Sequence, residues 1–228
     1  EAIVSELHGE SRGRLRVLST VSFGVHALAP LCVEYRTAHP GVSIDLVLND
    51  QAINFVEEGF DVAVRVGDLA DSSLIARSLR PYRSVICACP AYLERQGVPQ
   101  APEDLAEHSC LGFAHPAAGR AWRLQGPHGE IVVPVRLALT ANNGEALRMA
   151  ALSGLGIIMQ PEVLLQDDLR AGRLARILPD YAPAARPMHV LTVADRKPPP
   201  KIRTFVDFLV ERFGANPPPK RKRNTKAA

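Results

Sequence analysis

The chain has 228 residues, of which 46% are hydrophobic and 22% are charged, and its formal net charge is +3 at pH 7. This length and composition suit a globular protein with a sizeable core and one or two domains, and no apolar run is long enough to span a membrane. Several basic residues gather at positions 220–223, so the remaining chain is close to neutral and is not by itself a nucleic-acid-binding surface.

The first strong pattern is a strand that ends in small hydroxyl residues and leads into a helix. Leu15 to Ser19 is apolar and strand-like, and helical spacing follows from about Phe23 to Ala38. At such a junction the free backbone N–H groups at the start of the helix favour an anion, and in an open α/β sheet this is the ligand-binding edge. The hydroxyl residues that form the junction are Ser19, Thr20 and Ser22, which are also ordinary helix-capping residues.

Two further strands follow, at residues 42–48 and 60–66, with a short helix expected from 50 to 59 between them. Strands that alternate with helices indicate a parallel sheet. Asn49 and Arg65 lie at the carboxyl ends of these two strands. Arg65 is suited to a bidentate contact with a ligand carboxylate, but a bridge to Asp50 or Asp68 is an equally good interpretation.

The second half of the chain is expected to form another domain, entered through strands near residues 74–79 and 85–88. Short strands then dominate up to residue 141, and Asn142-Asn143-Gly144 begins a helix that ends at Gly154. The remaining expected elements are a strand at 156–159, a helix at 161–170, a strand at 174–178, a return strand at 187–193 and a helix from Ile202 to Phe213.

Motifs for enzyme or metal chemistry are absent from the sequence. There is no P-loop or G-x-G-x-x-G motif, the seven histidines have no metal-binding spacing, and no paired carboxylates suggest acid–base catalysis. We therefore expect no metal, no cofactor and no enzymatic activity. The cysteines lack C-x-x-C spacing and favour a reduced, intracellular chain with buried thiols, with redox sensing as a minority interpretation; they are Cys32, Cys87, Cys89 and Cys110.

Several motifs in their order along the chain resemble the effector-binding region of LysR-type transcriptional regulators. The first are Gly13-Arg14-Leu15-Arg16-Val17 with Phe23-Gly24, and Phe60-Asp61-Val62-Ala63-Val64-Arg65-Val66-Gly67. Others are Asp71-Ser72-Ser73-Leu74-Ile75-Ala76-Arg77, Cys89-Pro90-Ala91-Tyr92-Leu93, His108-Ser109-Cys110-Leu111 and Gly154-Leu155-Gly156-Ile157-Ile158-Met159-Gln160-Pro161. Together they cover nearly all of residues 13–213.

The resemblance implies an α/β fold of two Rossmann-like subdomains joined by two crossover strands, like type 2 periplasmic binding proteins. Subdomain I would comprise 13–89 and 188–214, and subdomain II would comprise 90–187. Residues 1–12 would be the end of a linker helix that leads from a winged helix-turn-helix domain, and 215–228 a disordered basic tail, which is commonly solvated but could touch nucleic acid.

The resemblance also implies a small-molecule effector, which the chemistry of the residues suggests is a carboxylate, in the cleft between the subdomains. Carried over residue by residue, the cleft would be lined on one side by Ser19, Thr20, Ser22, Phe23, Asn49 and Arg65. The residues facing them would be Asn142, Asn143, Ile157 and Gln160.

The implied function is ligand sensing and oligomerisation in a cytoplasmic bacterial transcription regulator. The regulatory domains would form a homodimer through the helix face around Cys32 and Tyr35 and the helix at 161–170, with a tetramer in the full-length protein. Promoter DNA would be bound only by the N-terminal domain. Two alternatives share the scaffold: a periplasmic solute-binding protein for a small anion, and an enzyme.

Overall fold

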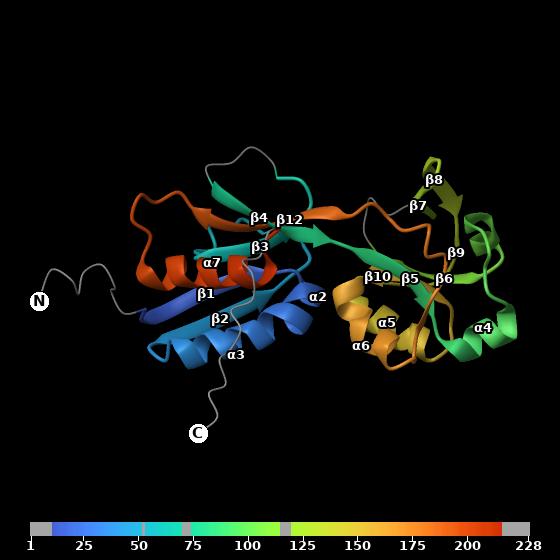
Figure 1. Cartoon of the computed structure of the whole chain (residues 1–228), viewed down its shortest axis with the longest axis horizontal. Coiled ribbons are helices and arrows are strands. Elements are labelled where there is room, and N and C mark those ends of the chain that lie inside the picture. Colours follow the sequence, from blue (N-terminus) through green and yellow to red (C-terminus); the bar gives the residue numbers. More distant parts are fainter. Residues whose placement is uncertain (1–10, 52, 70–73, 115–119, 216–228) are drawn as a thin grey trace, which may run out of the picture. The chain divides into compact units, whose positions relative to one another are not determined.

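The computed structural model describes residues 11–51, 53–69, 74–114 and 120–215, and these divide into two compact units (Figure 1). The first unit contains residues up to 20, residues 29–81 and residues from 187 onward, and the second contains 21–28 and 82–186. The chain therefore crosses between the units four times: at Thr20/Val21, Leu28/Ala29, Pro81/Tyr82 and Arg186/Pro187. The subdomain bounds expected from the sequence stay a prediction.

The first unit is built on a five-stranded sheet. Its strands are β1 (Gly13–Ser19), β2 (Val42–Leu48), β3 (Val62–Val66), β4 (Leu74–Tyr82) and β12 (Arg186–Val193). They lie in the order β2-β1-β3-β12-β4, with β1 parallel to both β2 and β3 and β12 antiparallel to β3. The expected parallel sheet is therefore confirmed around β1.

The helix expected from Phe23 to Ala38 is interrupted. It consists of α2 (Val21–Phe23), a π-helical turn η2 (Gly24–Leu28) and α3 (Ala29–Ala38). Pro30 gives a physical reason, because it has no N–H and its ring would meet the carbonyl of His26 in a regular α-helix. A wider turn just before Pro30 avoids that contact, and π-turns are frequent at functional sites.

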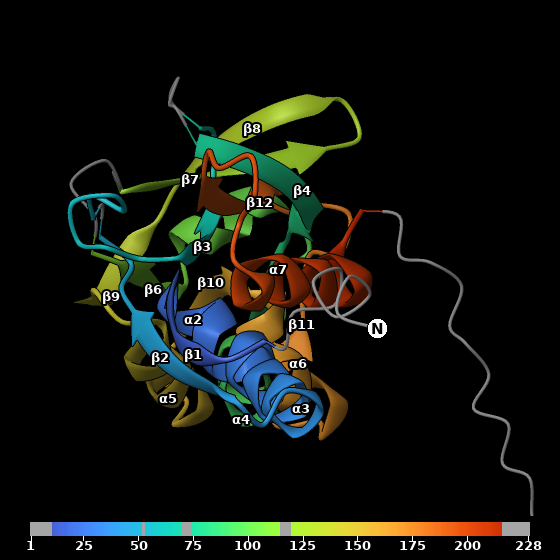
Figure 2. The same ribbon diagram turned by 90° about the vertical axis from the view of Figure 1, so that its left-hand side faces the viewer.

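Two helices pack side by side on the first sheet, as Figures 1 and 2 show. α3 contacts β2, and α7 (Pro200–Phe213) contacts β1 and α3. Tyr35 of α3 is fully buried, with its ring edge-on to Phe205 at 5.0 Å between centroids and its hydroxyl 2.8 Å from that of Thr204. A second buried cluster of this unit contains Leu18, Phe55, Phe60, Ala63 and Leu191.

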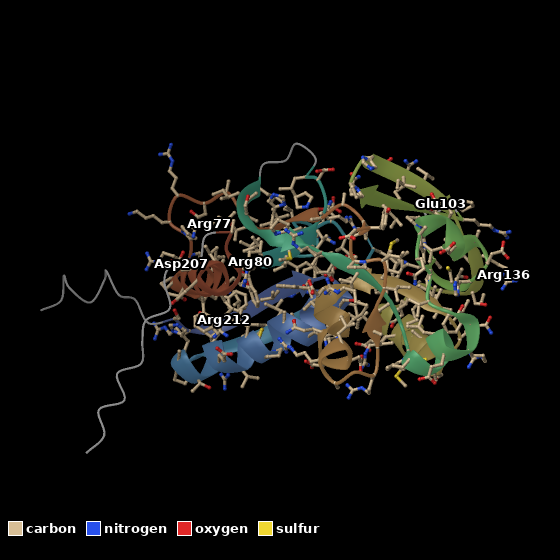
Figure 3. The ribbon with its side chains drawn as sticks, turned by 45° about the vertical axis from the view of Figure 1, so that its right-hand side comes forward. Arg77, Arg80, Glu103, Arg136, Asp207 and Arg212 are labelled. Atoms are coloured by element: carbon tan, nitrogen blue, oxygen red, sulfur yellow. The ribbon has the colours of Figure 1, made fainter. Side chains whose placement is uncertain are left out.

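The end of α7 is fastened to β4 (Figure 3). Arg80 donates a 2.6 Å hydrogen bond to the carbonyl of Arg212, and Arg77 pairs with Asp207 at 2.7 Å. A cation on the last carbonyls of a helix complements the helix dipole. The helix expected to close the chain is confirmed, and its position is fixed by these contacts as well as by its apolar face.

The second unit has its own mixed sheet, in the order β11-β5-β10-β6-β9. β10 is antiparallel to β5 and parallel to β6, and β6 is parallel to β9. A separate two-stranded hairpin, in which β7 pairs antiparallel with β8, lies between β6 and β9 in the sequence. The bounds are β5 Ser84–Ala88, β6 Ser109–Phe113, β7 Ala121–Gly126, β8 Gly129–Pro134, β9 Arg136–Ala141, β10 Ile157–Pro161 and β11 Ala175–Arg176.

Helices of the second unit complete one apolar core with this sheet. They are α4 (Pro90–Gln96), the 3₁₀ helix η3 (Pro102–Ala106), α5 (Gly144–Leu152) and α6 (Glu162–Arg170). The core includes Leu147 of α5, Leu165 of α6 and Trp122, the chain's single tryptophan. Trp122 fluorescence therefore reports on the folding of this unit.

A chain of charges joins α5 to α6 inside the second unit. The carboxylate of Asp168 has no exposed surface and accepts hydrogen bonds from Arg148 at 2.5 and 3.1 Å and from Arg173 at 2.7 Å. Burial alone would raise the pKa of Asp168, but the hydrogen bonds and charges of the two arginines outweigh it and lower that pKa. Arg148 also pairs with Glu145 at 3.2 Å, and Glu145 with His26.

Two expected elements differ from the structure. Residues 55–59 form turns instead of a helix, and the carbonyls of Gln51 and Ile53 just before them accept hydrogen bonds from Arg65 at 3.3 and 3.1 Å. The strand expected at 174–178 has only two residues, since Leu178 adopts a left-handed backbone with φ of 48°. The helix expected at residues 1–9 and the tail from 216 lie outside the described residues.

We expect Leu209→Ala to destabilise the first unit. Leu209 has no exposed surface, and deleting its buried methyl groups costs about 2–5 kcal/mol of unfolding free energy. Urea unfolding followed by far-UV circular dichroism measures this loss. Leu155→Ala is the matched control, since Leu155 is 44% exposed and should change stability by less than about 1 kcal/mol. Equal losses in both variants would contradict the assignment of Leu209 to the core.

Asp168→Asn should destabilise the second unit at pH 7. Breaking a buried ion pair costs about 3–5 kcal/mol, and the lower end applies because Arg173 stays half-exposed. Because the folded pKa of Asp168 is lowered, its contribution is present above the unfolded pKa and is lost as the pH falls through the folded pKa. The difference from wild type in urea unfolding, followed by Trp122 fluorescence, should therefore shrink below about pH 4.

The neighbouring Asp167→Asn is the control for this measurement. The Asp167 side chain is 81% exposed, and its ion pair with Arg170 is long at 3.5 Å. Removing the Asp167 charge should therefore lower the unfolding free energy by less than about 1 kcal/mol. A pH-independent defect in Asp168→Asn would show that the ion pairs are not the cause.

Candidate functional site

The carboxyl ends of β1, β2 and β3 lie together at one edge of the first sheet. Ser19 ends β1 opposite Leu48 at the end of β2, and the backbone N–H of Asn49 donates to the carbonyl of Ser19 at 2.9 Å. β3 pairs with β1 at Leu18 and then continues to Arg65. Four residues expected from the sequence to bind a ligand are therefore carried by this edge: Ser19, Thr20, Asn49 and Arg65.

Two buried hydroxyls at this edge have no hydrogen-bond partner among the described residues. They are Oγ of Ser19, which has no exposed surface, and Oγ1 of Thr20. Neither hydroxyl therefore acts as a helix cap within the described chain. A buried polar group without a partner costs about 1–3 kcal/mol, which a ligand that supplies the partner would recover.

The other two residues at this edge order the backbone around it. Asn49 Oδ1 accepts from the N–H of Gln51 at 2.8 Å, and the Arg65 guanidinium donates to the carbonyls of Gln51 and Ile53. Burial lowers the pKa of Arg65 from its ordinary value. Arg65 thus brings a half-buried positive charge to the edge while it fixes the segment that follows β2.

His189 was not anticipated from the sequence. It lies on β12 directly opposite Arg65 in the antiparallel register, and its Nδ1 is buried without a partner among the described residues. Only the pairing of β12 with β3 brings these two residues together. The alternation of the return strand was recognisable in the sequence, but its register was not.

Within the second unit, the start of α5 gathers several of the expected residues. Asn143 caps the helix, since its Oδ1 accepts from the N–H groups of Glu145 and Ala146 at 2.9 and 3.2 Å. The preceding Asn142 is exposed. The predicted helix start is confirmed.

Gly144 allows two polar side chains to approach the first turn of α5 closely. A Cβ at this position would lie 3.1 Å from Oε1 of Gln160 and 3.2 Å from Oγ of Ser22, closer than ordinary contacts. Gln160 is almost fully buried. A larger residue here would require these side chains to shift, and the glycine lets Ser22 and Gln160 lie close to the first turn of α5 beside Asn143.

The two apolar residues expected to contact a ligand are both buried. Phe23 packs edge-on to Tyr82 with 6.5 Å between ring centroids, and Ile157 pairs with Cys110 inside the second sheet. Both contribute to the core of the described structure. Neither is brought to a surface in the described unit.

The ion pair between His26 and Glu145 was also missed by sequence reasoning. The Glu145–Arg148 spacing of three residues on a helix is a recognisable signal, but nothing in the sequence connects it to a histidine 119 residues earlier. This contact holds the π-helical turn against α5.

The four cysteines are free thiols. Burial raises the pKa of Cys32 to about 11 and those of Cys87 and Cys110 to about 12, with nearby charges as smaller influences on the latter two. A protonated thiol is a poor nucleophile, so these environments favour packing over redox chemistry.

The described residues contain no cluster of histidine, cysteine or carboxylate side chains suited to a metal ion. Among the described helices, none is both long enough and apolar enough to cross a membrane.

Comparison with known proteins agrees with the geometry. The profile of the LysR substrate binding domain family matches residues 8–214. The HTH-type transcriptional regulator CrgA of Neisseria meningitidis is 35% identical over 213 residues, covering 92% of this chain and 70% of CrgA.

Solved structures of regulators are also similar. The structure of CrgA, described as a LysR-type transcriptional regulator, superposes with a TM-score of 0.83 and 34% identity over 93% of this chain and 72% of that one. The regulatory domain of AphB from Vibrio vulnificus gives 0.76 and 29%, over 88% and 98%. The expected two-subdomain, periplasmic-binding-protein-like fold is thereby confirmed, and the chain belongs to the LysR substrate-binding domain family, the effector-binding region of LysR-type transcriptional regulators.

Proposed function

We propose that this domain senses a small carboxylate through the hydroxyls at the end of β1 and thereby controls transcription by its regulator. The observation that carries the proposal is that the buried hydroxyls of Ser19 and Thr20 have no hydrogen-bond partner within the described segments. Hydroxyls that donate to a carboxylate oxygen form charge-assisted hydrogen bonds, which are stronger than bonds between neutral groups. A ligand of this class satisfies both hydroxyls at once.

The charge at the same edge supports an acid over a neutral ligand. Arg65 reaches this edge with a half-buried guanidinium, and Leu18, next to Ser19, pairs with Ala63, only two residues before Arg65. A carboxylate bound there gains favourable Coulomb energy from this cation in a partly desolvated setting. Asn142, Asn143, Ser22 and Gln160 of the second unit, with Phe23, Asn49 and Ile157, stay predicted ligand contacts.

The effector would act by shifting a conformational equilibrium. A ligand changes the populations of two states only by its difference in affinity for them, and a shift from 1:99 to 99:1 needs about 5.5 kcal/mol of such difference. The regulator would then present its DNA-binding parts to the promoter in a different arrangement. We place this activity in the cytoplasm, with promoter DNA bound by a helix-turn-helix domain of the full-length regulator.

Thr20→Val is expected to abolish effector binding without destabilising the protein. The hydroxyl has no partner in the part of the chain that the structure describes, so its replacement by a methyl group should leave the unfolding free energy unchanged or raise it slightly. In a thermal-shift screen with small aliphatic and aromatic acids, a ligand at 100 times its Kd adds about 2.7 kcal/mol to the unfolding free energy of the wild-type protein. Each kcal/mol raises Tm by about 2–4 °C in a chain of this size.

The matched control for this screen is Thr140→Val, because Thr140 is exposed on β9. We expect the control to keep the ligand-induced shift and Thr20→Val to lose it. A full shift in both variants, for every acid that binds wild type, would place the effector elsewhere and overturn the proposal.

We also propose that the domain forms a homodimer, which pairs again to a tetramer in the full-length regulator. The expected interface on α3 needs one correction: Tyr35 is fully buried in the core and cannot contribute. Cys32 does line a surface groove of about 530 Å³ between α3 and β2, together with Val33, Arg36, Thr37 and Ile44.

The partner for this groove would be α6 of a second copy. Val33 is 68% exposed at the groove, and Arg36 supplies a positive charge. α6 presents the exposed Asp167 and the partly exposed Val163. In the proposed dimer, Val163 contacts Val33 and Asp167 pairs with Arg36. An isologous dimer would use this pairing twice.

Val33→Asp should weaken this dimer. An aspartate at this position must be desolvated in the apolar contact, and it would compete with Asp167 of the partner subunit for Arg36, so we expect the dimer Kd to rise by at least about tenfold. Sedimentation velocity over a concentration series measures this change. Val98→Asp, at an equally apolar exposed position of the second unit, should leave the Kd unchanged. Identical dimerisation of both variants and wild type would exclude the groove as the interface.

A further inference from the structure

The second unit contains a cavity of about 200 Å³ away from the start of α5. It lies against the first residues of β5 and is closed by the segment that follows β11. Its apolar floor includes Val85 and Ile86 of β5 with Ile177 and Leu178, all of which are buried. This volume is below the roughly 300–1,000 Å³ of typical ligand pockets, so the cavity suits a small molecule.

The wall of the cavity is held in place at both ends. Ile177 donates its N–H to the carbonyl of Ile86 at 3.0 Å, and Ala182 accepts a 2.7 Å hydrogen bond from Gln125 of the β7–β8 hairpin. Between them Leu178 adopts its left-handed conformation, and its carbonyl accepts from Tyr181 at 2.9 Å. A preformed wall lowers the entropic cost of binding a ligand.

The conformation of Leu178 has an energetic cost that packing offsets. A non-glycine residue in the left-handed region loses about 1–2 kcal/mol, and Leu178 recovers it by burying its side chain in the cavity floor. The Tyr181 ring packs against Gly126, where a Cβ would lie only 2.9 Å from a ring carbon. The aromatic wall therefore depends on a glycine in the hairpin.

The rim of the cavity carries an unmatched positive charge. Arg176 and Glu162 form an ion pair at 2.5 Å and neutralise each other. Arg83 also lines the cavity from an exposed position, and within residues 11–51, 53–69, 74–114 and 120–215 its guanidinium makes no hydrogen bond or ion pair. An apolar pocket with one free guanidinium at its mouth is suited to a compact monoanion with an apolar body.

We propose that this cavity is a second ligand site, distinct from the hydroxyls of Ser19 and Thr20, that binds a small monocarboxylate through Arg83. The apolar part of the ligand lies on Ile86 and Leu178, and its carboxylate accepts from the Arg83 guanidinium. Arg83 is two residues from the point where the chain enters the second unit, and Pro183 of the opposite wall is three residues from the point where it leaves. The bound ligand therefore lies beside two of the four points at which the chain crosses between the units.

The test titrates the ¹⁵N-labelled chain with benzoate and with benzamide, its neutral isostere, at up to about 10 mM, tenfold above a Kd of 1 mM. Benzoate should shift the backbone amide signals of Arg83, Ile177 and Tyr181, and benzamide should bind at least about tenfold more weakly, because it lacks the charge. The same readout in Thr20→Val should be unchanged. That result distinguishes this site from the proposed effector site, because loss of ligand binding at Ser19 and Thr20 would leave the shifts of these amide signals unchanged.

Arg83→Gln should weaken benzoate binding by about tenfold or more. The matched control is Arg123→Gln, which removes the same charge from an exposed pair with Glu130 on the hairpin. The proposal is overturned if benzoate leaves these amides unshifted, if benzamide binds equally well, or if both arginine variants behave alike. Loss of the amide shifts in Thr20→Val would also overturn it, since benzoate would then act only through the first site.

Discussion

The structure depends on a constraint that β1 imposes. This strand is paired on both edges. Its first half carries Arg14 and Arg16, which pair with Asp45 of β2, whereas Val17, Leu18 and Ser19 have no exposed surface, so its second half is buried on both faces. A buried strand end has no room for a charged side chain without a partner, and a small hydroxyl is the polar group that it tolerates most easily. Ser19 and Thr20 are therefore the positions from which the end of β1 can offer hydrogen bonds to a ligand.

The parts of the fold that follow from local periodicity could be predicted, and those that rest on distant partners could not. The strands of the parallel sheet, the helix start at Asn143 and the closing helix from Pro200 all have signals within a few residues. Asp168 had no such signal: an aspartate on an amphipathic helix is ordinarily exposed, and only Arg148 and Arg173 make its burial tolerable. The same limit explains why the pairing of His189 with Arg65 and that of His26 with Glu145 were missed.

The candidate site was predictable in kind and less so in detail. Hydroxyls at the end of a strand indicate an anion site whether or not they cap a helix, and the structure shows that neither buried hydroxyl is used by the described chain. The sequence could not show whether Phe23 and Ile157 contact a ligand or pack in the core, because apolar residues in these two roles have the same spacing. Their burial in the described units reflects that ambiguity.

Asp168 and Arg83 are two charged side chains of the second unit with different surroundings. Asp168 is buried and has all of its charge matched by two arginines, so it stabilises the packing of α5 and α6. Arg83 has no such match among the described residues, and it lies at the mouth of a cavity whose walls are fixed by backbone hydrogen bonds. If both proposed ligands bind, their coupling must be reciprocal: a carboxylate at Arg83 that favours effector binding is itself bound more tightly when the effector is present. Arg83 and Pro183 lie beside two of the four chain crossings between the units, so such coupling needs only that the two ligands prefer the same conformation of these segments.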